Sequence, residues 1–203
     1  MSKPQKQRTF VMLKPDAVQR SLIGEMIKRI ERTGLKLVGL KLAVCDEKRL
    51  LEHYAKDDAW YLKKGLGIVD GMKSRGEEIT REPIEYGKDI VRALVKFMMV
   101  GPVVQMVWEG NEAMVVVKKI AGTTEPSTSD VGTLRGDFTI DSYNLANMDN
   151  RAARNLIHIT DPADGAEEAN REIAIWFQES ELLSYRLLVD EMLYDVDLNS
   201  TLE

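Results

Sequence analysis

The two histidines, His53 and His158, are the residues of this sequence best suited to imidazole chemistry. A neutral imidazole has an unperturbed pKa of about 6.5, so near pH 7 it offers a free ring nitrogen as a nucleophile. His53 lies among the apolar residues of an expected helix, and we interpret it as a surface or packing residue. His158 follows a long irregular segment. Taken alone, it would equally suit a loop histidine that bonds to the backbone, so its role stays open at this point.

Common nucleotide-binding motifs are missing or incomplete. The sequence contains no GxxxxGK[ST] phosphate loop, which excludes the P-loop route to nucleotide handling. Gly65 and Gly67 resemble the start of a dinucleotide fingerprint, but Asp70 stands in place of the third glycine and no strand leads in. Asp137-Phe138 is followed by Thr139, without a kinase catalytic loop. These near matches therefore predict no function.

Length and composition are those of a globular domain. The 203 residues favour a single domain over 1–203, with 44% hydrophobic and 30% charged residues. The net charge of -5 argues against a protein that binds nucleic acid through a basic face, although a local cluster of cations would suffice for a nucleotide. No apolar run approaches the ~20 residues that span a membrane, and residues 1–8 do not resemble a secretory signal. Cys45 is the only cysteine, so we expect no intramolecular disulfide and a cytoplasmic location.

Hydrophobic periodicity predicts an α+β fold. We expect strands at 10–13, 38–44, 101–108 and 172–177, and helices at 22–33, from 46 onward, at 90–99 and at 111–120. This order fits a ferredoxin-like βαββαβ fold, an antiparallel sheet with helices packed on one face. Residues 57–89 and 123–155 lack sustained periodicity, and an acidic amphipathic helix is expected after 177. Long irregular segments of this kind are usually functional or disordered.

Six short segments of the chain resemble, in order, the signature segments of the nucleoside diphosphate kinases. They are Lys14 to Arg20 (KPDAVQR), Gly101 to Val104 (GPVV), Gly122 to Pro126 (GTTEP), Gly132 to Phe138 (GTLRGDF), Asn155 to His158 (NLIH) and Glu172 to Phe177 (EIAIWF). The resemblance covers roughly residues 8–56, 90–138 and 150–178. The family's fold is also ferredoxin-like, in agreement with the fold that periodicity predicts.

The resemblance implies a specific reaction. A nucleoside diphosphate kinase transfers the γ-phosphate of a nucleoside triphosphate to a nucleoside diphosphate by a ping-pong mechanism, here through phospho-His158. The resemblance also implies that Glu172 orients the imidazole and that Thr160, where the family usually has serine, steadies Glu172. The alternative for Glu172 is an exposed carboxylate at a strand edge.

The resemblance further assigns residues to the nucleotide. It places Lys14 at the transferring phosphate and the ribose 3′-hydroxyl, Tyr54 at the transferring group, Arg135 and Lys118 at the β-phosphate, Thr124 at an outer phosphate oxygen, and Asn155 at the ribose. Mg²⁺ would bridge the nucleotide phosphates with few or no direct protein ligands. Lys118 could instead be an ordinary helix-face lysine, and Tyr54 a core residue. Relatives assemble as hexamers or tetramers, so we expect a homo-oligomer, with nucleoside di- and triphosphates as partners and no nucleic acid or membrane.

Several features depart from the family pattern. Lys118 stands where arginine is usual and loses the bidentate grip on phosphate. The position of the base-stacking phenylalanine falls on Ile90 or Val91, which have no aromatic ring. Segments 57–89 and 139–150 are longer than in the family, and residues 178–203 form a C-terminal extension. We hypothesise that segment 57–89 supplies the missing aromatic from Trp60, Tyr61 or Tyr86; the alternatives are a solvated loop or a subunit contact.

Two other classes of function remain to be compared with an active enzyme. A non-enzymatic scaffold would be expected to lose the nucleophile, whereas His158 is present. An RNA-binding module could use the same sheet topology, but it needs aromatic residues displayed on central strands and a basic surface.

Overall fold

A four-stranded antiparallel sheet forms the centre of the molecule in the computed structural model, which describes residues 6–190. The strands are β1 (Lys6–Leu13), β2 (Lys36–Ala43), β3 (Val103–Asn111) and β4 (Ile157–Ile159), in the order β2-β3-β1-β4. Each neighbouring pair is antiparallel. This is the strand order of a ferredoxin-like sheet, so the predicted α+β class is confirmed.

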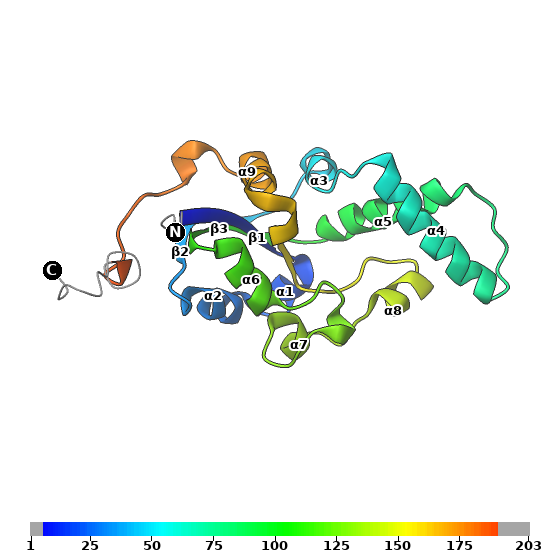
Figure 1. Cartoon of the computed structure of the whole chain (residues 1–203), viewed down its shortest axis with the longest axis horizontal. Helices are drawn as coiled ribbons and strands as arrows, with labels where there is room; N and C mark the ends of the chain where they lie inside the picture. The colour runs from blue at the N-terminus through cyan, green and yellow to red at the C-terminus, as the bar shows by residue number, and fades with distance from the viewer. Residues whose placement is uncertain (1–5, 191–203) are drawn as a thin grey trace, which may run out of the picture.

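Helices cover both faces of the sheet, whereas the sequence predicted them on one (Figure 1). The α-helices are α1 (Pro15–Gln19), α2 (Ile23–Glu31), α3 (Glu47–His53), α4 (Asp58–Ser74), α5 (Pro83–Met98), α6 (Ala113–Ala121), α7 (Leu134–Phe138), α8 (Tyr143–Met148) and α9 (Gly165–Trp176). Helices α3, α5 and α9 pack on one face, and α1, α2 and α6 pack on the other.

The burial of β1 explains this two-sided arrangement. Its side chains alternate between the faces, with Phe10 and Met12 in one core cluster and Val11 and Leu13 in the other. All four are fully buried. This half of β1 is apolar on both faces and therefore needs cover on both sides.

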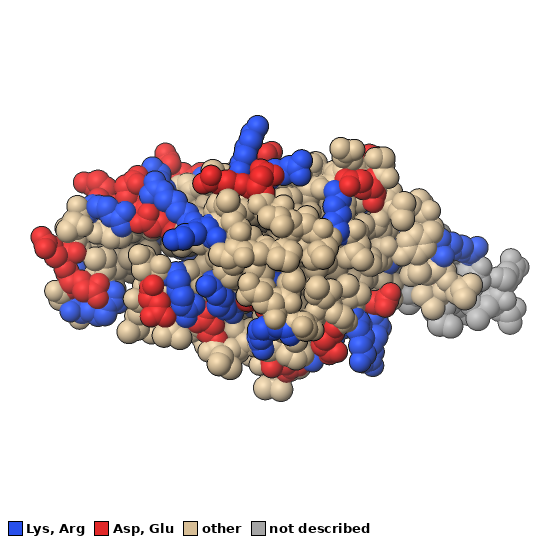
Figure 2. Space-filling model, turned by 180° about the vertical axis from the view of Figure 1, so that it is seen from behind, with Lys and Arg blue, Asp and Glu red and all other residues tan. Residues whose placement is uncertain are grey.

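The same cover removes the RNA-binding alternative. Phe10 and Trp108, the aromatic residues of the two central strands, are completely buried beneath helices rather than displayed. Figure 2 shows, on the face that it presents, Lys and Arg side chains interspersed with Asp and Glu around a broad uncharged area.

The predicted strand at 172–177 is wrong, because these residues belong to α9 and its end. Alternation of Ile173, Ile175 and Phe177 suggested a strand, but α9 buries Ala169, Glu172, Ile173 and Trp176 at helical spacing. The fourth strand is instead β4, whose three residues are too few to show a period. Asn111 ends β3 rather than capping the next helix, which follows Glu112.

Segment 57–89 is largely helical, in contrast to the irregular structure expected. It forms α4 and the start of α5, which pack closely together at one end of the molecule (Figure 1). Two glycines make the contact possible. A Cβ on Gly65 would lie 1.7 Å from the Pro83 carbonyl oxygen, and one on Gly87 would lie 1.9 Å from the Tyr61 carbonyl oxygen. These glycines therefore allow close packing of the helices rather than ending them.

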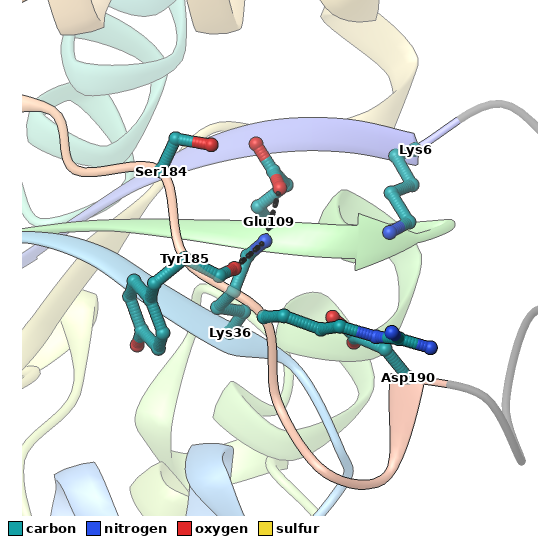
Figure 3. Close-up of a pocket in the computed structure, with 7 residues that line it drawn as sticks. Lys6, Lys36, Glu109, Ser184, Tyr185 and Asp190 are labelled. Atoms are coloured by element: carbon teal, nitrogen blue, oxygen red, sulfur yellow. Dashed lines mark hydrogen bonds and ion pairs between the residues drawn. The ribbon is translucent and has the colours of Figure 1, made fainter.

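The C-terminal extension crosses the sheet beside β2. Leu183 N–H donates to the Val38 carbonyl oxygen at 2.8 Å, and the Tyr185 hydroxyl donates to the Leu37 carbonyl oxygen at 2.7 Å. Lys36 contacts both Glu109 and the Tyr185 carbonyl oxygen (Figure 3). Residues 182–187 are not helical, so the helix expected after 177 is not found there, and residues 191–203 lie outside the described part.

The glycine contact yields a prediction for stability. We expect Gly65→Ala to lower the free energy of unfolding by about 1–3 kcal/mol, because the added methyl group overlaps the α5 backbone. Gly67 lies on the same helix with nothing within 4 Å of an added Cβ. Gly67→Ala should therefore raise stability by about 0.5–1 kcal/mol through helix propensity. Urea unfolding followed by circular dichroism measures both, and equal effects of the two variants would contradict the close packing of α4 and α5.

Candidate active site

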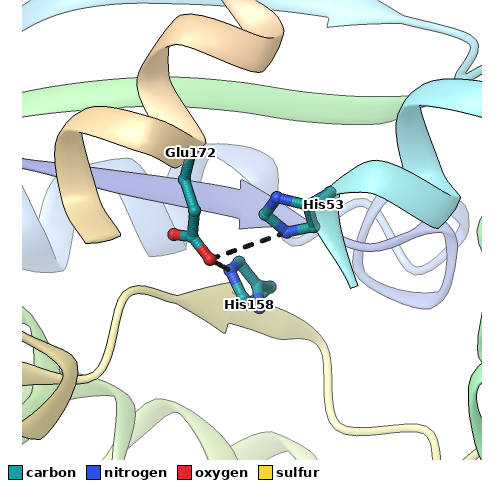
Figure 4. A group of neighbouring side chains, drawn as sticks. All are labelled: His53, His158 and Glu172. Carbon is teal, nitrogen blue, oxygen red and sulfur yellow. Dashed lines mark hydrogen bonds and ion pairs between the residues drawn. The ribbon is translucent and has the colours of Figure 1, made fainter. Parts of the chain in front are cut away.

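His158 lies in the middle of β4, opposite Met12 of β1. Its Nε2 is 2.9 Å from Oε1 of Glu172 on α9 (Figure 4). An ionised carboxylate can only accept a hydrogen bond, so Nε2 carries the proton and Nδ1 keeps its lone pair. Nδ1 is therefore the ring nitrogen that can act as a nucleophile.

The Glu172 carboxylate is buried and fully hydrogen-bonded. Its side chain is 5% exposed, and Oε2 accepts from the Thr160 hydroxyl at 2.5 Å. Burial alone would raise the pKa of Glu172, but the electrostatic interaction and the hydrogen bond with His158 outweigh it and leave the pKa below its usual value. The structure thus brings together His158, Glu172 and Thr160 as predicted, and the strand-edge alternative for Glu172 is wrong.

His53 is part of the same group, which the sequence interpretation missed. It is a packing residue, 2% exposed, but its ring centroid lies 4.4 Å from that of His158. His53 Nδ1 accepts from the Trp176 indole N–H at 3.2 Å, so the neutral ring carries its proton on Nε2. That nitrogen lies 3.9 Å from Glu172 Oε1 (Figure 4). Burial, aided by His158, lowers the pKa of His53 well below its usual value, so the ring stays neutral.

Arg171 holds the helix that carries His53. Its guanidinium donates to the backbone carbonyl oxygens of Glu52 and His53, each at 3.1 Å, at the end of α3. A cation at a helix C-terminus satisfies carbonyls that have no partner within the helix. Because Arg171 precedes Glu172 on α9, this contact fixes α3 against the carboxylate.

His53, His158 and Glu172 place three potential metal-ligand atoms within 4.8 Å of one another. His53 Nδ1 is hydrogen-bonded to Trp176, and Glu172 is hydrogen-bonded to His158 and Thr160, whereas His53 Nε2 has no hydrogen-bond partner among the described residues. We therefore interpret the group as a hydrogen-bonded array that orients His158.

Tyr54 is a core residue that lies beside His158. Its ring packs in the core cluster and lies edge-on to His158, with 5.6 Å between the ring centroids. Its buried hydroxyl has no hydrogen-bond partner among the described residues. Burial raises the pKa of Tyr54, so the hydroxyl stays protonated and can donate to an incoming group.

Lys14 and Asn155 are joined by a network that also shapes the turn before His158. Lys14 Nζ donates to Asn155 Oδ1 at 2.7 Å, and Lys14 N–H donates to the Leu156 carbonyl oxygen at 2.8 Å. Leu156 N–H donates to Asp16 Oδ2 at 3.0 Å. Leu156 has a φ of 66°, in the left-handed region that costs a bulky residue roughly 1–3 kcal/mol. These bonds hold that sharp turn and set Asn155 beside Lys14.

Arg135 is buried and already well engaged. Its guanidinium donates to the carbonyl oxygens of Gly122, Thr123, Asn155 and Ile157. These bonds use four of its five N–H groups and leave one on Nη2. Burial lowers the pKa of Arg135 to about 10, so it remains charged near pH 7.

Lys118 and Thr124 lie at the outer side of this group. Lys118 Nζ pairs with the Asp161 carboxylate, and Asp161 also acts electrostatically on Arg135. Thr124 is exposed, and its carbonyl oxygen accepts from Asn155 Nδ2 at 3.4 Å. Thr124 is therefore hydrogen-bonded to Asn155, and Lys118 is linked to Arg135 through the Asp161 carboxylate.

A cleft of about 640 Å³ opens between the α4–α5 pair and α8. Lys14, Tyr54 and Asn155 line it, and so do Ile90 and Val91. Of the aromatic residues proposed for segment 57–89, Trp60 and Tyr86 line the cleft, whereas Tyr61 is not among its lining residues. The base-stacking hypothesis for Trp60 and Tyr86 stays a prediction.

Comparisons with known proteins identify the family. The family model described as "Nucleoside diphosphate kinase" matches residues 7–66 and 83–182. A nucleoside diphosphate kinase of Pyrobaculum aerophilum is 40% identical over 182 residues, covering 87% of this chain and 98% of its own length. The chain belongs to the nucleoside diphosphate kinase family.

Solved structures of nucleoside diphosphate kinases share the fold. An NDP kinase from Pyrobaculum aerophilum superposes with a TM-score of 0.81 at 38% identity, over 89% of this chain and all of that one. A nucleoside-diphosphate kinase from Borrelia burgdorferi, described as a transition-state mimic with bound vanadate and ADP, gives 0.74 at 33% identity, over 93% and 97%.

This nucleoside diphosphate kinase is a transferase that moves the γ-phosphate of a nucleoside triphosphate to a nucleoside diphosphate. The two-step, ping-pong mechanism through a phosphohistidine is general to its family, as is the need for a divalent cation. Within the described residues, the kinase has no helix both long and apolar enough to cross a bilayer.

The state of Lys14 predicts a pH dependence for nucleotide binding. Burial lowers the pKa of Lys14 to about 8, although Asp16 opposes the shift. Phosphates bound beside Lys14 would favour its charged form and raise its pKa. Above pH 8, binding of ADP would then require Lys14 to take up a proton. The affinity for ADP should therefore fall by up to about tenfold per pH unit. Lys14→Arg stays charged and should lack this slope between pH 7.5 and 9.5. Calorimetric titration measures both, and a flat wild-type profile would show that Lys14 does not contact the phosphates.

Proposed function

We propose that His158 is the residue that carries the phosphoryl group. In the first half-reaction, Nδ1 attacks the γ-phosphorus; the N–P bond forms as the bond to the bridging oxygen breaks, and the nucleoside diphosphate leaves. A second diphosphate takes the group back by the reverse steps. The supporting observation is the 2.9 Å hydrogen bond from His158 Nε2 to Glu172, which leaves Nδ1 free. Glu172 keeps the Nε2 proton hydrogen-bonded and offsets the positive charge that develops on the ring.

Phosphoryl transfer asks a protein mainly for positioning and for positive charge around the transferred group. We assign Lys14 to the transferring phosphate and the ribose 3′-hydroxyl, Tyr54 to the transferring group, and Asn155 to the ribose. Arg135, through its remaining Nη2 donor, and Lys118 would bind the β-phosphate, with Thr124 at an outer oxygen. The contacts among Lys14, Asn155 and Arg135 support this grouping.

We assign the base to the cleft beside Ile90. This side chain lines the cleft with Val91 and Leu94, so it offers an apolar but non-aromatic surface. The phosphates would then lie at the Lys14 end. A nucleotide placed in this way would extend from the α5 wall to Tyr54, whose ring centroid lies 5.6 Å from that of His158.

Mg²⁺ is the divalent cation that we propose, bound through the nucleotide. It prefers oxygen ligands in octahedral geometry. The phosphate-binding residues proposed here are mainly cationic, and the neighbouring Asp161 carboxylate is paired with Lys118. The phosphate oxygens would therefore supply most of its ligands, and the ion would neutralise phosphate charge during transfer.

We further propose a cytoplasmic homo-oligomer, a hexamer or a tetramer. Cys45 is a buried free thiol, as suits a reducing compartment. Strand β2 lies at the edge of the sheet and exposes Leu40 and Leu42, which are 52% and 67% exposed, and Val44 directly after the strand is 73% exposed. An apolar edge strand favours pairing with another chain. Light scattering decides between these assemblies and a monomer.

His158→Ala should abolish the phosphoenzyme while leaving nucleotide binding largely intact. Incubation with γ-³²P-ATP should label the wild-type chain with an acid-labile, alkali-stable group, as expected of phosphohistidine. Trypsin separates the two histidines into peptides 50–56 and 155–171, so mapping distinguishes them. Label in peptide 50–56, or on the His158→Ala chain, would show that His158 is not the carrier.

Glu172→Gln tests the orientation of the nucleophile. A glutamine amide can donate its N–H to His158 Nε2 and so favour the tautomer with the proton on Nδ1. The substitution also removes the negative charge of the carboxylate. The single-turnover rate of phosphorylation should therefore fall at least tenfold, whereas ADP affinity changes little. Thr160→Ser, which keeps the hydroxyl, serves as the conservative control. A variant with a normal rate and reduced stability would make Glu172 a structural residue only.

A further inference from the structure

Segment 139–150 brings a tyrosine to the residues that we assign to the nucleotide. Tyr143 is the first residue of α8 and lines the cleft together with Lys14 and Asn155. Its hydroxyl oxygen lies 3.5 Å from Asn155 Nδ2. The residue is 38% exposed, so a ligand in the cleft can reach it.

The direction of the hydrogen bonds leaves the Tyr143 proton available. Lys14 can only donate, so Asn155 must turn its carbonyl oxygen to Lys14 and its amide nitrogen to Tyr143. The Tyr143 oxygen is then an acceptor toward Asn155. Asn155 is also the one hydrogen-bond partner of this hydroxyl among the described residues, so its O–H can donate to a ligand. Burial raises the pKa of Tyr143, which keeps that proton in place.

Five hydrogen bonds hold Tyr143 and the residues around it in position. Its backbone N–H donates to Glu125 Oε2 at 3.0 Å, and the Ser142 hydroxyl caps α8 by accepting from Leu145 N–H. The Asp141 carboxylate makes two bonds to the Arg151 guanidinium, at 2.7 and 2.9 Å, and accepts from Arg154 N–H at 2.7 Å. These bonds lower the pKa of Asp141 to about 2, so the anchor is charged throughout the neutral range. A segment fixed in this way can position a side chain for binding.

We propose that Tyr143 is a nucleotide-binding residue of this kinase, whose hydroxyl donates a hydrogen bond to a ribose hydroxyl of the bound nucleotide. The inference rests on the proposed function, which places the ribose at Asn155. Tyr143 lies next to that amide and also interacts electrostatically with Arg135, so the comparison of deoxynucleotides below distinguishes a ribose contact from a phosphate contact. Segment 139–150 therefore forms part of the nucleotide site rather than a solvated loop.

The test is the affinity of the full-length chain for ADP, 2′-deoxy-ADP and 3′-deoxy-ADP in the wild type and in Tyr143→Phe. This substitution removes only the hydroxyl. Loss of one neutral hydrogen bond should weaken ADP binding about 3- to 10-fold. With the deoxynucleotide that lacks the contacted hydroxyl, wild type and variant should differ less than twofold, because the partner is already gone. Tyr185→Phe is the matched control, because the Tyr185 hydroxyl donates to the carbonyl oxygen of Leu37 in β2. This variant should bind all three nucleotides like the wild type.

Three outcomes would overturn the proposal. Unchanged ADP affinity in Tyr143→Phe would show that the hydroxyl makes no useful contact, and tighter binding would show that it obstructs the site. An equal loss with all three nucleotides would show that it acts through Asn155 and not on the ribose. Phosphopeptide mapping of the wild type distinguishes failure of this inference from failure of the proposed function. If peptide 155–171 is labelled and Tyr143→Phe binds ADP like the wild type, only this inference is rejected. If peptide 155–171 is not labelled, the proposed function is rejected.

Discussion

The buried carboxylate of Glu172 is the group on which the active-site geometry depends. A carboxylate taken out of water costs several kcal/mol unless hydrogen-bond donors replace its hydration. Here the donors come from two residues of the β4 region, His158 and Thr160, while His53 closes the remaining side. Helix α9 supplies the carboxylate and, through Trp176 and Arg171, also holds His53 and the end of α3. The position of the His158 ring is therefore set jointly by one strand and two helices, and a shift of any of them would disturb it.

The candidate site combines residues held by the sheet with residues held by outer helices. The residues proposed for the phosphates rest on the sheet and on the turn at Leu156, whose strained backbone is held by Lys14 and Asp16. The walls of the cleft come from α4, α5 and α8, which lie outside the sheet (Figure 1). Direct backbone packing at Gly65 and Gly87 stiffens the first wall, and the Asp141–Arg151 pair anchors the second.

Sequence reasoning succeeded where side-chain periodicity or a distinctive motif was present. Strands β2 and β3 and helices α2 and α6 were predicted close to their observed bounds, because each carries a clear apolar pattern. Only the apolar half of β1 was predicted, since its first four residues are polar. Strand β4 has three residues and shows no period, so the alternation in α9 was mistaken for the last strand. Gly65 was interpreted as part of an irregular segment because close helix packing depends on a partner that local sequence does not reveal. His53 was missed for the same reason, since Trp176, its hydrogen-bond partner, lies 123 positions away along the chain. Its place directly before Tyr54 was the available signal.

Cys45, the single thiol of the chain, has a practical consequence. It is 5% exposed, and burial raises its pKa to about 11. At pH 7 only roughly one molecule in 10,000 carries the reactive thiolate at this residue. Thiol-specific reagents should therefore label the native protein very slowly. Cysteines introduced at the exposed Leu66 on α4 and Leu145 on α8 would be modified selectively, and a pair of probes there would report the separation of the two walls as nucleotide enters.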